Sequence, residues 1–410
     1  MYNVGFGDCF LLSFRYDRPL ADQHILIDFG TVGGKPDMMA VANAIKEDCG
    51  GKLYAVVATH RHRDHISGFS DKTGDESTGA IIASCKPEVV LQPWTENPDA
   101  GAKDKEAPLL SRKGTGSRRS FTASLNAMNS FAETAFQYAQ RLRGDKGRPG
   151  TLERLALNNT TNPEAVENLR TMGKRRPRFL EFGSPSGLEN KRLLPGVKVR
   201  VLGPPNYAEW NIRKYAKKSD EYWISLMYWG LQERACGLEG GSALFPRQPR
   251  YEKEQQPIHT RWFTERADAA LKNNALGIVT VLDDFLNNTS LILLFEVRGK
   301  KLLFPGDAQL ENWSYALEQA GVKEILKDVD LYKVGHHGSR NATPKSLWEL
   351  FDKRKRRVLR TMMSTSPGVY HRSEEGKVPS KNLVDTLERQ SQLKDTQKLK
   401  RKRGPMLIKF

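Results

Sequence analysis

A dense run of metal-capable side chains follows directly on an apolar strand-like segment, and this feature most restricts how the chain can fold. Leu53 to Ala58 is a continuous apolar stretch of strand length, typical of a strand covered on both faces. The run His60-Arg61-His62-Arg63-Asp64-His65 begins two residues later. In extended chain His60 and His62 point the same way, and a turn then brings Asp64 and His65 to a neighbouring point. Imidazole and carboxylate groups at this density suit a divalent transition metal.

A lone histidine is more often structural than a metal ligand, so the context of the run matters. His60, His62, His65 and His336 make up half of the eight histidines of the chain, and they lie beside the ends of apolar strands. This clustering favours a metal site over a purely structural role. The isolated His24 and His371 are better explained as structural or surface residues.

Apolar periodicity predicts alternating strands and helices around this run. Strands are expected at 8–15, 24–28, 53–58, 88–94, 196–202, 329–334, 358–363 and 406–408, with a hairpin over 289–305. Helices are expected at 36–48, 120–142, 164–172, 309–320 and 380–389. This order predicts a layered α/β domain in which two mixed sheets are covered by helices.

The chain is predicted to form one domain over 1–410, with two basic insertions. Residues 96–195 are polar, basic and rich in Gly, Ser, Asn and Arg, and residues 235–275 are rich in Gly, Pro, Gln and charge. Both stretches interrupt the pattern of strands and helices, which indicates additions to a common core.

The net charge of +17 favours a polyanionic partner such as nucleic acid. No stretch approaches the roughly 18 consecutive apolar residues that span a bilayer. The chain begins without the basic and apolar segments of a signal peptide, and its four cysteines are scattered. We therefore expect a soluble cytoplasmic protein with reduced thiols and no membrane partner.

The order of carboxylates and histidines resembles that of the metallo-β-lactamase superfamily, whose hallmark is His-x-His-x-Asp-His at the end of a buried strand. Asp28 matches an aspartate at the end of an early strand, Asp307 a carboxylate between two metals, and His336 a late histidine ligand. The segments Val4 to Asp8, Asn288 to Ser290, and Lys333 to Ser339 are similar to the hydrolase domain of ComEC competence proteins. The resemblance covers about 3–95 and 280–345, without the membrane segments of that channel, so it implies a free-standing relative.

This resemblance implies a four-layer αββα metallo-β-lactamase sandwich that binds two divalent ions, Zn²⁺ or Mn²⁺. His60 and His62 would hold the first ion, and Asp64, His65 and one of the adjacent His336 and His337 the second, with Asp307 between them. Of the two, His336 is the expected ligand, because in the family the ligand usually follows the small residue at the strand end directly. A metal-bound hydroxide would then attack a phosphodiester. Asp64 and His337 are the expected catalytic residues, with His337 contacting the phosphate or protonating the leaving oxygen, and Asp28 orients a histidine ring.

The ligand set expected for the first ion lacks one histidine of the superfamily pattern. Many members have a further histidine before the bridging aspartate, and only His259 lies in that interval here, without the expected flanking glycine. The ComEC-like subgroup has Asn and Ser at this strand start, matched by Asn288 and Ser290, which we expect behind the ligands. The first ion would then be held weakly or open to water.

Three functions fit these observations. The first is a metal-dependent phosphodiester hydrolase, namely a nuclease that acts on DNA or RNA. The second is a phosphodiesterase for a small molecule, or another ester hydrolase of the same fold, because fold does not fix function. The third is a nucleic-acid-binding subunit of a multi-protein system with a vestigial site. The intact ligand set favours an enzyme over a binding subunit.

Overall fold

The computed structural model describes the following residues: 1–17, 19–33, 36–71, 77–99, 129, 132–140, 150–206, 276, 279–280, 282–351, 358–366, 378–398 and 405–410. The chain divides into two compact units, which are treated separately. The first unit comprises Met1–Thr122, Asn162–Trp210 and Asp284–Phe410, and it contains every sheet described below. The second comprises Ala123–Thr161 and Asn211–Asp283, and includes helix α5 (Thr151–Asn158).

The first sheet has five strands in the order β1-β2-β3-β4-β5. Strand β1 runs antiparallel to β2, and the pairs β2–β3, β3–β4 and β4–β5 are parallel. The strands are β1 (Cys9–Phe14), β2 (Gln23–Phe29), β3 (Ala55–Val57), β4 (Val89–Pro93) and β5 (Arg178–Leu180).

The second sheet has six strands in the order β11-β10-β9-β8-β7-β6. Neighbours from β8 to β11 are parallel, whereas β7 runs antiparallel to both β6 and β8. The strands are β6 (Val197–Gly203), β7 (Ile292–Val297), β8 (Lys300–Phe304), β9 (Leu331–Lys333), β10 (Arg360–Met363) and β11 (Gln392–Asp395).

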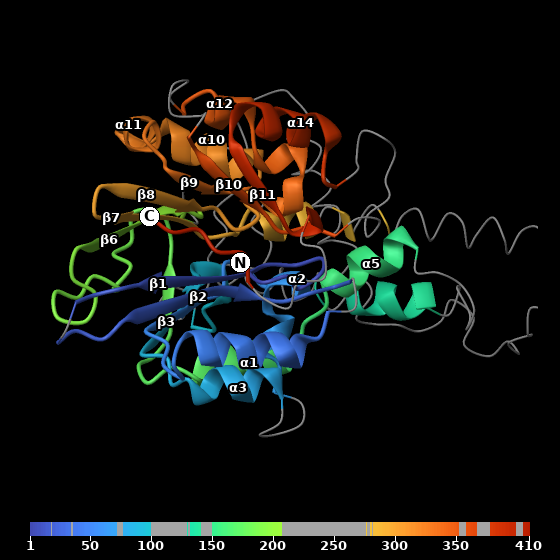
Figure 1. Ribbon diagram of the computed structural model, residues 1–410. Helices are drawn as coiled ribbons and strands as arrows, with labels where there is room; N and C mark the ends of the chain where they lie inside the picture. Colours follow the sequence, from blue (N-terminus) through green and yellow to red (C-terminus); the bar gives the residue numbers. More distant parts are fainter. Residues whose placement is uncertain are drawn as a thin grey trace, which may run out of the picture. The chain divides into compact units, whose positions relative to one another are not determined.

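Helices cover the outer face of each sheet in this unit (Figure 1). On the first sheet lie α1 (Met38–Asp48), α3 (Thr78–Ser84) and α6 (Pro163–Thr171). On the second lie α10 (Leu310–Glu318), α11 (Val322–Leu326), α12 (Lys345–Trp348) and α14 (Lys381–Gln390). The side chains of Asp37 and Ser77 accept hydrogen bonds from the first turns of α1 and α3, which fixes where these helices begin.

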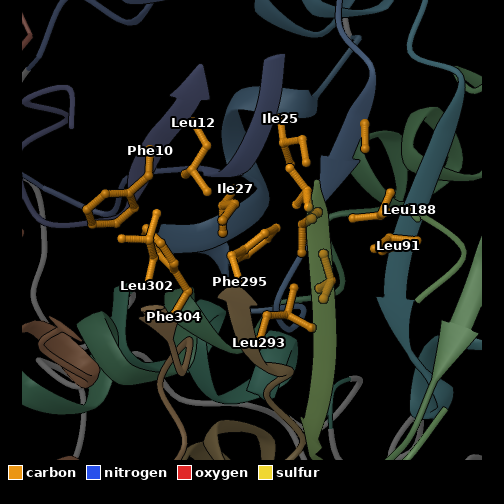
Figure 2. Packing of buried hydrophobic residues seen from close by; sticks show 14 of the residues in the cluster. Phe10, Leu12, Ile25, Ile27, Leu91, Leu188, Leu293, Phe295, Leu302 and Phe304 are labelled. Carbon is orange, nitrogen blue, oxygen red and sulfur yellow. The ribbon is translucent and has the colours of Figure 1, made fainter. Parts of the chain in front are cut away.

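Three apolar cores lie between these layers. Because successive side chains of a strand point to opposite faces of the sheet, one strand contributes to the cores on both of its faces. Within β2, Ile25 and Ile27 face the second sheet, while Leu26 faces α1 and α3. Strand β7 follows the same rule, with Leu293 and Phe295 on the inner face. Figure 2 shows side chains of β1 and β2 pointing toward those of β7 and β8 across the space between the sheets. Strands buried on both faces therefore appear as unbroken apolar runs in the sequence.

The mixed α/β architecture with two mixed sheets confirms the coarse prediction of fold class. Most predicted strands and helices are present within a few residues of their expected bounds. The predicted strand at 406–408 is wrong, because residues 405–410 form no strand. In the ranges that the structure describes, no helix combines the length and apolar character needed to cross a membrane.

The predicted insertion at 96–195 needs a correction. Its later part belongs to the first unit, because β5 pairs with β4 in parallel register and α6 packs on the outer core of the first sheet. Residues 123–161 belong to the second compact unit. The single domain over 1–410 stays a prediction. The second predicted insertion, at 235–275, lies outside the described residues.

Candidate metal centre

The candidate site lies where several strands of both sheets end, and the topology explains why. Strands β2 and β3 are parallel, so the residues that follow them meet at one edge of the first sheet. Strand β1 is antiparallel to β2, which places Asp8, just before β1, at that same edge. In the second sheet, β8, β9 and β10 are parallel and place Asp307, His337 and Ser364 at a common edge. A hydrogen bond of 2.9 Å from the amide of Leu291 to the carbonyl of Thr59 joins the two edges.

The histidine-rich run changes conformation halfway along its length. His60 and His62 follow β3, and the short helix α2 (Arg63–Ile66) then turns Asp64 and His65 back toward them. This is the turn that the spacing of the run predicted. The arginine between the first two histidines is itself anchored, since Arg61 forms an ion pair of 2.7 Å with the buried Glu96. Glu96 belongs to the short helix η3 (Trp94–Glu96) after β4.

One group of potential ligands contains His60, His62 and Asp64. One ligand atom from each lies within 4.8 Å of the others, and all three residues are 1% exposed. The Nε2 atom of His60 is 2.9 Å from Nδ1 of His62. Burial, together with the neighbouring rings of His65 and His62, holds the pKa of His60 well below its usual value, so this imidazole is neutral. A neutral imidazole is the form that binds a metal ion.

A second group contains Asp64, His65, Asp307 and His337, again with ligand atoms within 4.8 Å of one another. Nε2 of His65 is 3.0 Å from Oδ2 of Asp307, and Nε2 of His337 is 2.9 Å from Oδ2 of Asp64. Asp64 belongs to both groups. Its carboxylate is therefore shared by two neighbouring groups of potential ligands.

In both histidines of this second group, the ring nitrogen Nδ1 points away from the other potential ligands and contacts an oxygen outside the group. Nδ1 of His65 is 2.8 Å from Oδ2 of Asp28, and Nδ1 of His337 is 2.9 Å from the carbonyl oxygen of Ser364. When the ring is neutral, a proton on Nδ1 satisfies each acceptor and leaves the lone pair of Nε2 directed into the group. Asp28 also accepts hydrogen bonds of 2.7 Å from the amide and the hydroxyl of Thr59.

Two buried atoms of this group test whether it fits a cation. Nε2 of His65 and Oδ2 of Asp307 are only 3.0 Å apart, yet neither forms a hydrogen bond in the structure. Buried polar atoms without partners are rare, because each loses its solvation. A lone pair and a carboxylate oxygen that converge in this way, with two more ligands nearby, fit a divalent ion of the zinc or manganese type.

Without a cation, the group forms a network of opposite charges. Burial opposes the charged forms of His65 and His337, but the carboxylates around them prevail and raise the pKa of both rings. Burial likewise opposes the charge on Asp64, yet His65 and His337 lower its pKa to about 2. The pKa of Asp307 is held well below its usual range by His65 and Lys333, also against the effect of burial.

The structure exchanges the places expected for His336 and His337. The imidazole of His337 is fully buried and joins Asp64, His65 and Asp307, whereas His336 is half-buried with Nδ1 3.5 Å from Nε2 of Gln309. The reason is the turn after β9, where both residues adopt positive φ, 43° for His336 and 51° for His337. This turn carries the second histidine, and not the first, back into the site.

Asn288 and Ser290 lie behind the site and take different roles. Oδ1 of Asn288 accepts hydrogen bonds from the amides of Gln309 and Asn312, so this side chain caps the start of α10. Oγ of Ser290 accepts a hydrogen bond of 3.1 Å from the amide of Asp307 and fixes the backbone of that residue. His259 and His371 lie outside the described residues.

Asp8 ends the segment Val4 to Asp8 that carries the resemblance, and three further residues of the site were not singled out from the sequence: Thr59, Lys333 and Ser364. Ser364 contributes a backbone carbonyl, and Thr59 a backbone amide and a hydroxyl common in loops, so neither gave a sequence signal. Lys333 did give one, because it is the only charged residue in the apolar segment Leu331 to Val334. Asp8 lies between glycine-rich turn residues and the first strand, a position that equally suits an ordinary turn.

No protein-family model matches this chain, and a search of curated proteins finds no match either.

Proposed function

We propose that this chain is a metal-dependent phosphodiester hydrolase of the metallo-β-lactamase type, acting as a nuclease on DNA or RNA. The observation that carries the proposal is the pair of buried ligand groups that share Asp64. Imidazoles and carboxylates in two adjoining sets suit two divalent ions, the arrangement used for in-line displacement at phosphorus. The helix-covered pair of sheets, with the His-x-His-x-Asp-His run at the end of β3, supports the fold assignment.

Each residue has a role that follows from its position. His60, His62 and Asp64 would hold one ion, and Asp64, His65, Asp307 and His337 the other. When bound, such ions would lower the pKa of a water to near neutrality and draw charge from the phosphoryl oxygens. Asp28 and the Ser364 carbonyl orient the rings of His65 and His337. His336 is half-buried, and its backbone amide donates to Asp307. We therefore assign to His336 the phosphate contact that was expected for His337 from the sequence.

Loss of a ligand tests this assignment directly. Either His62→Ala or Asp307→Ala should abolish metal-dependent cleavage of DNA and RNA, because each removes a buried ligand contributed by a different sheet. Asp330→Asn provides a matched control, since this carboxylate pairs with the exposed Lys300 at the start of β8, away from the ligands. Cleavage that persists at the parental rate in both ligand variants would contradict the proposal.

The substrate class can be tested by salt. The net charge of +17 supports a polyanionic substrate, and a protein that neutralises many phosphates loses affinity steeply as salt rises. We expect cleavage of a long nucleic acid to fall sharply between low and moderate salt, while hydrolysis of a small chromogenic phosphodiester stays nearly constant. A flat salt response for both substrates would favour a small-molecule phosphodiesterase. Nucleic-acid binding without turnover of either substrate would favour a vestigial site.

A further inference from the structure

A buried lysine lies among the carboxylates of the metal centre. Lys333 is the last residue of β9, and its side chain is 2% exposed. Lysine is almost never fully buried unless it is paired, because removing an ammonium group from water is costly. Here the alternation of β9 directs Leu331 into the core between the sheets, and Lys333, two residues later, follows it onto the same face.

The ammonium group of Lys333 meets three oxygens. It donates a hydrogen bond of 2.8 Å to the carbonyl of Gly306 and one of 3.0 Å to Oδ1 of Asp307, and it forms an ion pair with Oδ2 of Asp8. The two hydrogen bonds use two of the three donors of the ammonium group, and the ion pair with Asp8 adds a second carboxylate partner for its charge. Lys333 is therefore a fixed component of the site.

The two oxygens of Asp307 have different surroundings. Oδ1 accepts hydrogen bonds from Lys333 and from the amide of His336, each 3.0 Å long. Oδ2 is the atom that lies 3.0 Å from Nε2 of His65 and 3.5 Å from Nε2 of His337. The carboxylate is thus anchored through one oxygen and directed at the other ligands through the second.

We propose that Lys333 is a positioning residue of the metal centre, which holds Oδ1 of Asp307 so that only Oδ2 is directed at a cation. This inference rests on the proposed function, because it concerns the same metal centre. The alternative role for Lys333 is a simple counter-charge to Asp8 and Asp307. The two roles differ in what removal of the ammonium group does to cation binding. Loss of a positioning contact weakens binding, whereas loss of a nearby positive charge strengthens it.

The experiment is a titration of the metal-stripped full-length chain with Co²⁺, followed by visible absorption. For Lys333→Met, which removes the ammonium group and retains most of the side-chain volume, we expect affinity to fall about 10- to 100-fold. We also expect weaker visible bands, because Asp307 can then approach the ion through both oxygens and raise its coordination number. Unchanged or higher affinity for Co²⁺, with an unchanged spectrum, would overturn the inference.

Lys301→Met is the matched control, because it removes an ammonium group that donates to the carbonyl of Ile325 and not to a carboxylate of the site. Its affinity and spectrum should stay close to those of the parent. If Lys333→Met does not fold alone, the double variant Asp8→Asn with Lys333→Met removes both members of the ion pair, and it should show the same loss relative to Asp8→Asn. A parent chain that binds no Co²⁺ would refute the proposed function itself, whereas equal binding by parent and variant would refute only the role of Lys333.

Discussion

At the scale of single residues, Gly30 occupies a position where a side chain does not fit. It follows β2, and a Cβ atom at this position would lie 2.6 Å from the carbonyl oxygen of Arg63 and from the carbonyl carbons of Asp64 and His65. These are backbone atoms of α2, which cannot rotate away as a side chain could. The absence of a side chain at Gly30 thus allows the backbone of α2 to pack closely against the end of β2. Helix α2 carries Asp64 and His65, two of the proposed ligands.

We therefore predict that Gly30→Ala lowers the free energy of unfolding by about 1–3 kcal/mol, as overpacking in a closed interior does. The variant should also bind Co²⁺ more weakly, since α2 must shift. Urea denaturation and the visible titration measure the two effects. Gly299→Ala is the control, because its Cβ would meet open space although its φ is 72°. It should lose stability from the backbone alone and keep the parental affinity for Co²⁺; a similar loss of affinity in both variants would contradict the argument.

The same scale shows what the sequence could and could not predict about the site. Spacing within the run at 60–65 was enough to place His60, His62, Asp64 and His65 together, because a strand end and one turn fix their directions. Which of His336 and His337 enters the site depends on two successive positive φ angles. The types of these two residues do not predict such angles. Gly335 and Gly338 flank the two histidines and suit a turn, but they do not indicate which histidine enters the site.

At the scale of elements, periodicity predicted the longer strands, including β1 and β6 at two sheet edges, better than the short charged strands at the other two edges. β2, β3 and β7 are apolar on both faces and appear as long apolar runs. β5 and β11 were not predicted, since each lies at an edge and carries charged residues in a short segment. Edge strands are commonly polar, because an exposed apolar edge invites aggregation, so their sequences look like loops.

The pairing of β1 with β2 contains a titratable residue away from the ligands, and it yields a prediction about pH. His24 is buried in β2 with Nδ1 2.9 Å from Oγ of Ser13, and burial lowers its pKa below 6.5. Below pH 6.5 the unfolded chain binds this proton more readily than the folded chain does, so stability falls as pH falls.

We expect His24→Gln to lose less unfolding free energy than the parent when the pH is lowered from about 7.5 to about 5.5. Urea denaturation of the metal-stripped proteins at both pH values measures this difference. Ser13→Ala keeps the imidazole buried and should keep the parental pH dependence. If His24→Gln and the parent lose equal stability on acidification, the acid sensitivity arises elsewhere.

At the scale of the whole molecule, the proposed metal centre spans two sheets that share one apolar core. The first sheet and α2 supply His60, His62, Asp64 and His65, and the second sheet supplies Asp307 and His337. The buried carboxylates of Asp8, Asp28, Asp64 and Asp307 repel one another, and Lys333 compensates only part of that charge. A cation bound there would stabilise the folded unit selectively, because the ligands are far apart in the sequence and separate on unfolding.

This linkage gives a prediction for the melting temperature. A ligand present at about 1,000 times its Kd stabilises the folded state by about 4 kcal/mol, which corresponds to a rise on the order of 10 °C for a domain of this size. Adding Zn²⁺ or Mn²⁺ to the stripped chain should therefore raise the unfolding temperature measured by calorimetry, and a chelator should reverse the change. Asp307→Asn should abolish most of the rise, because it removes the ligand carboxylate contributed by the second sheet, whereas Asp330→Asn should keep it. An equal rise in Asp307→Asn would mean that the stabilising ion binds at other carboxylates, and the two sheets would then not be linked through this centre.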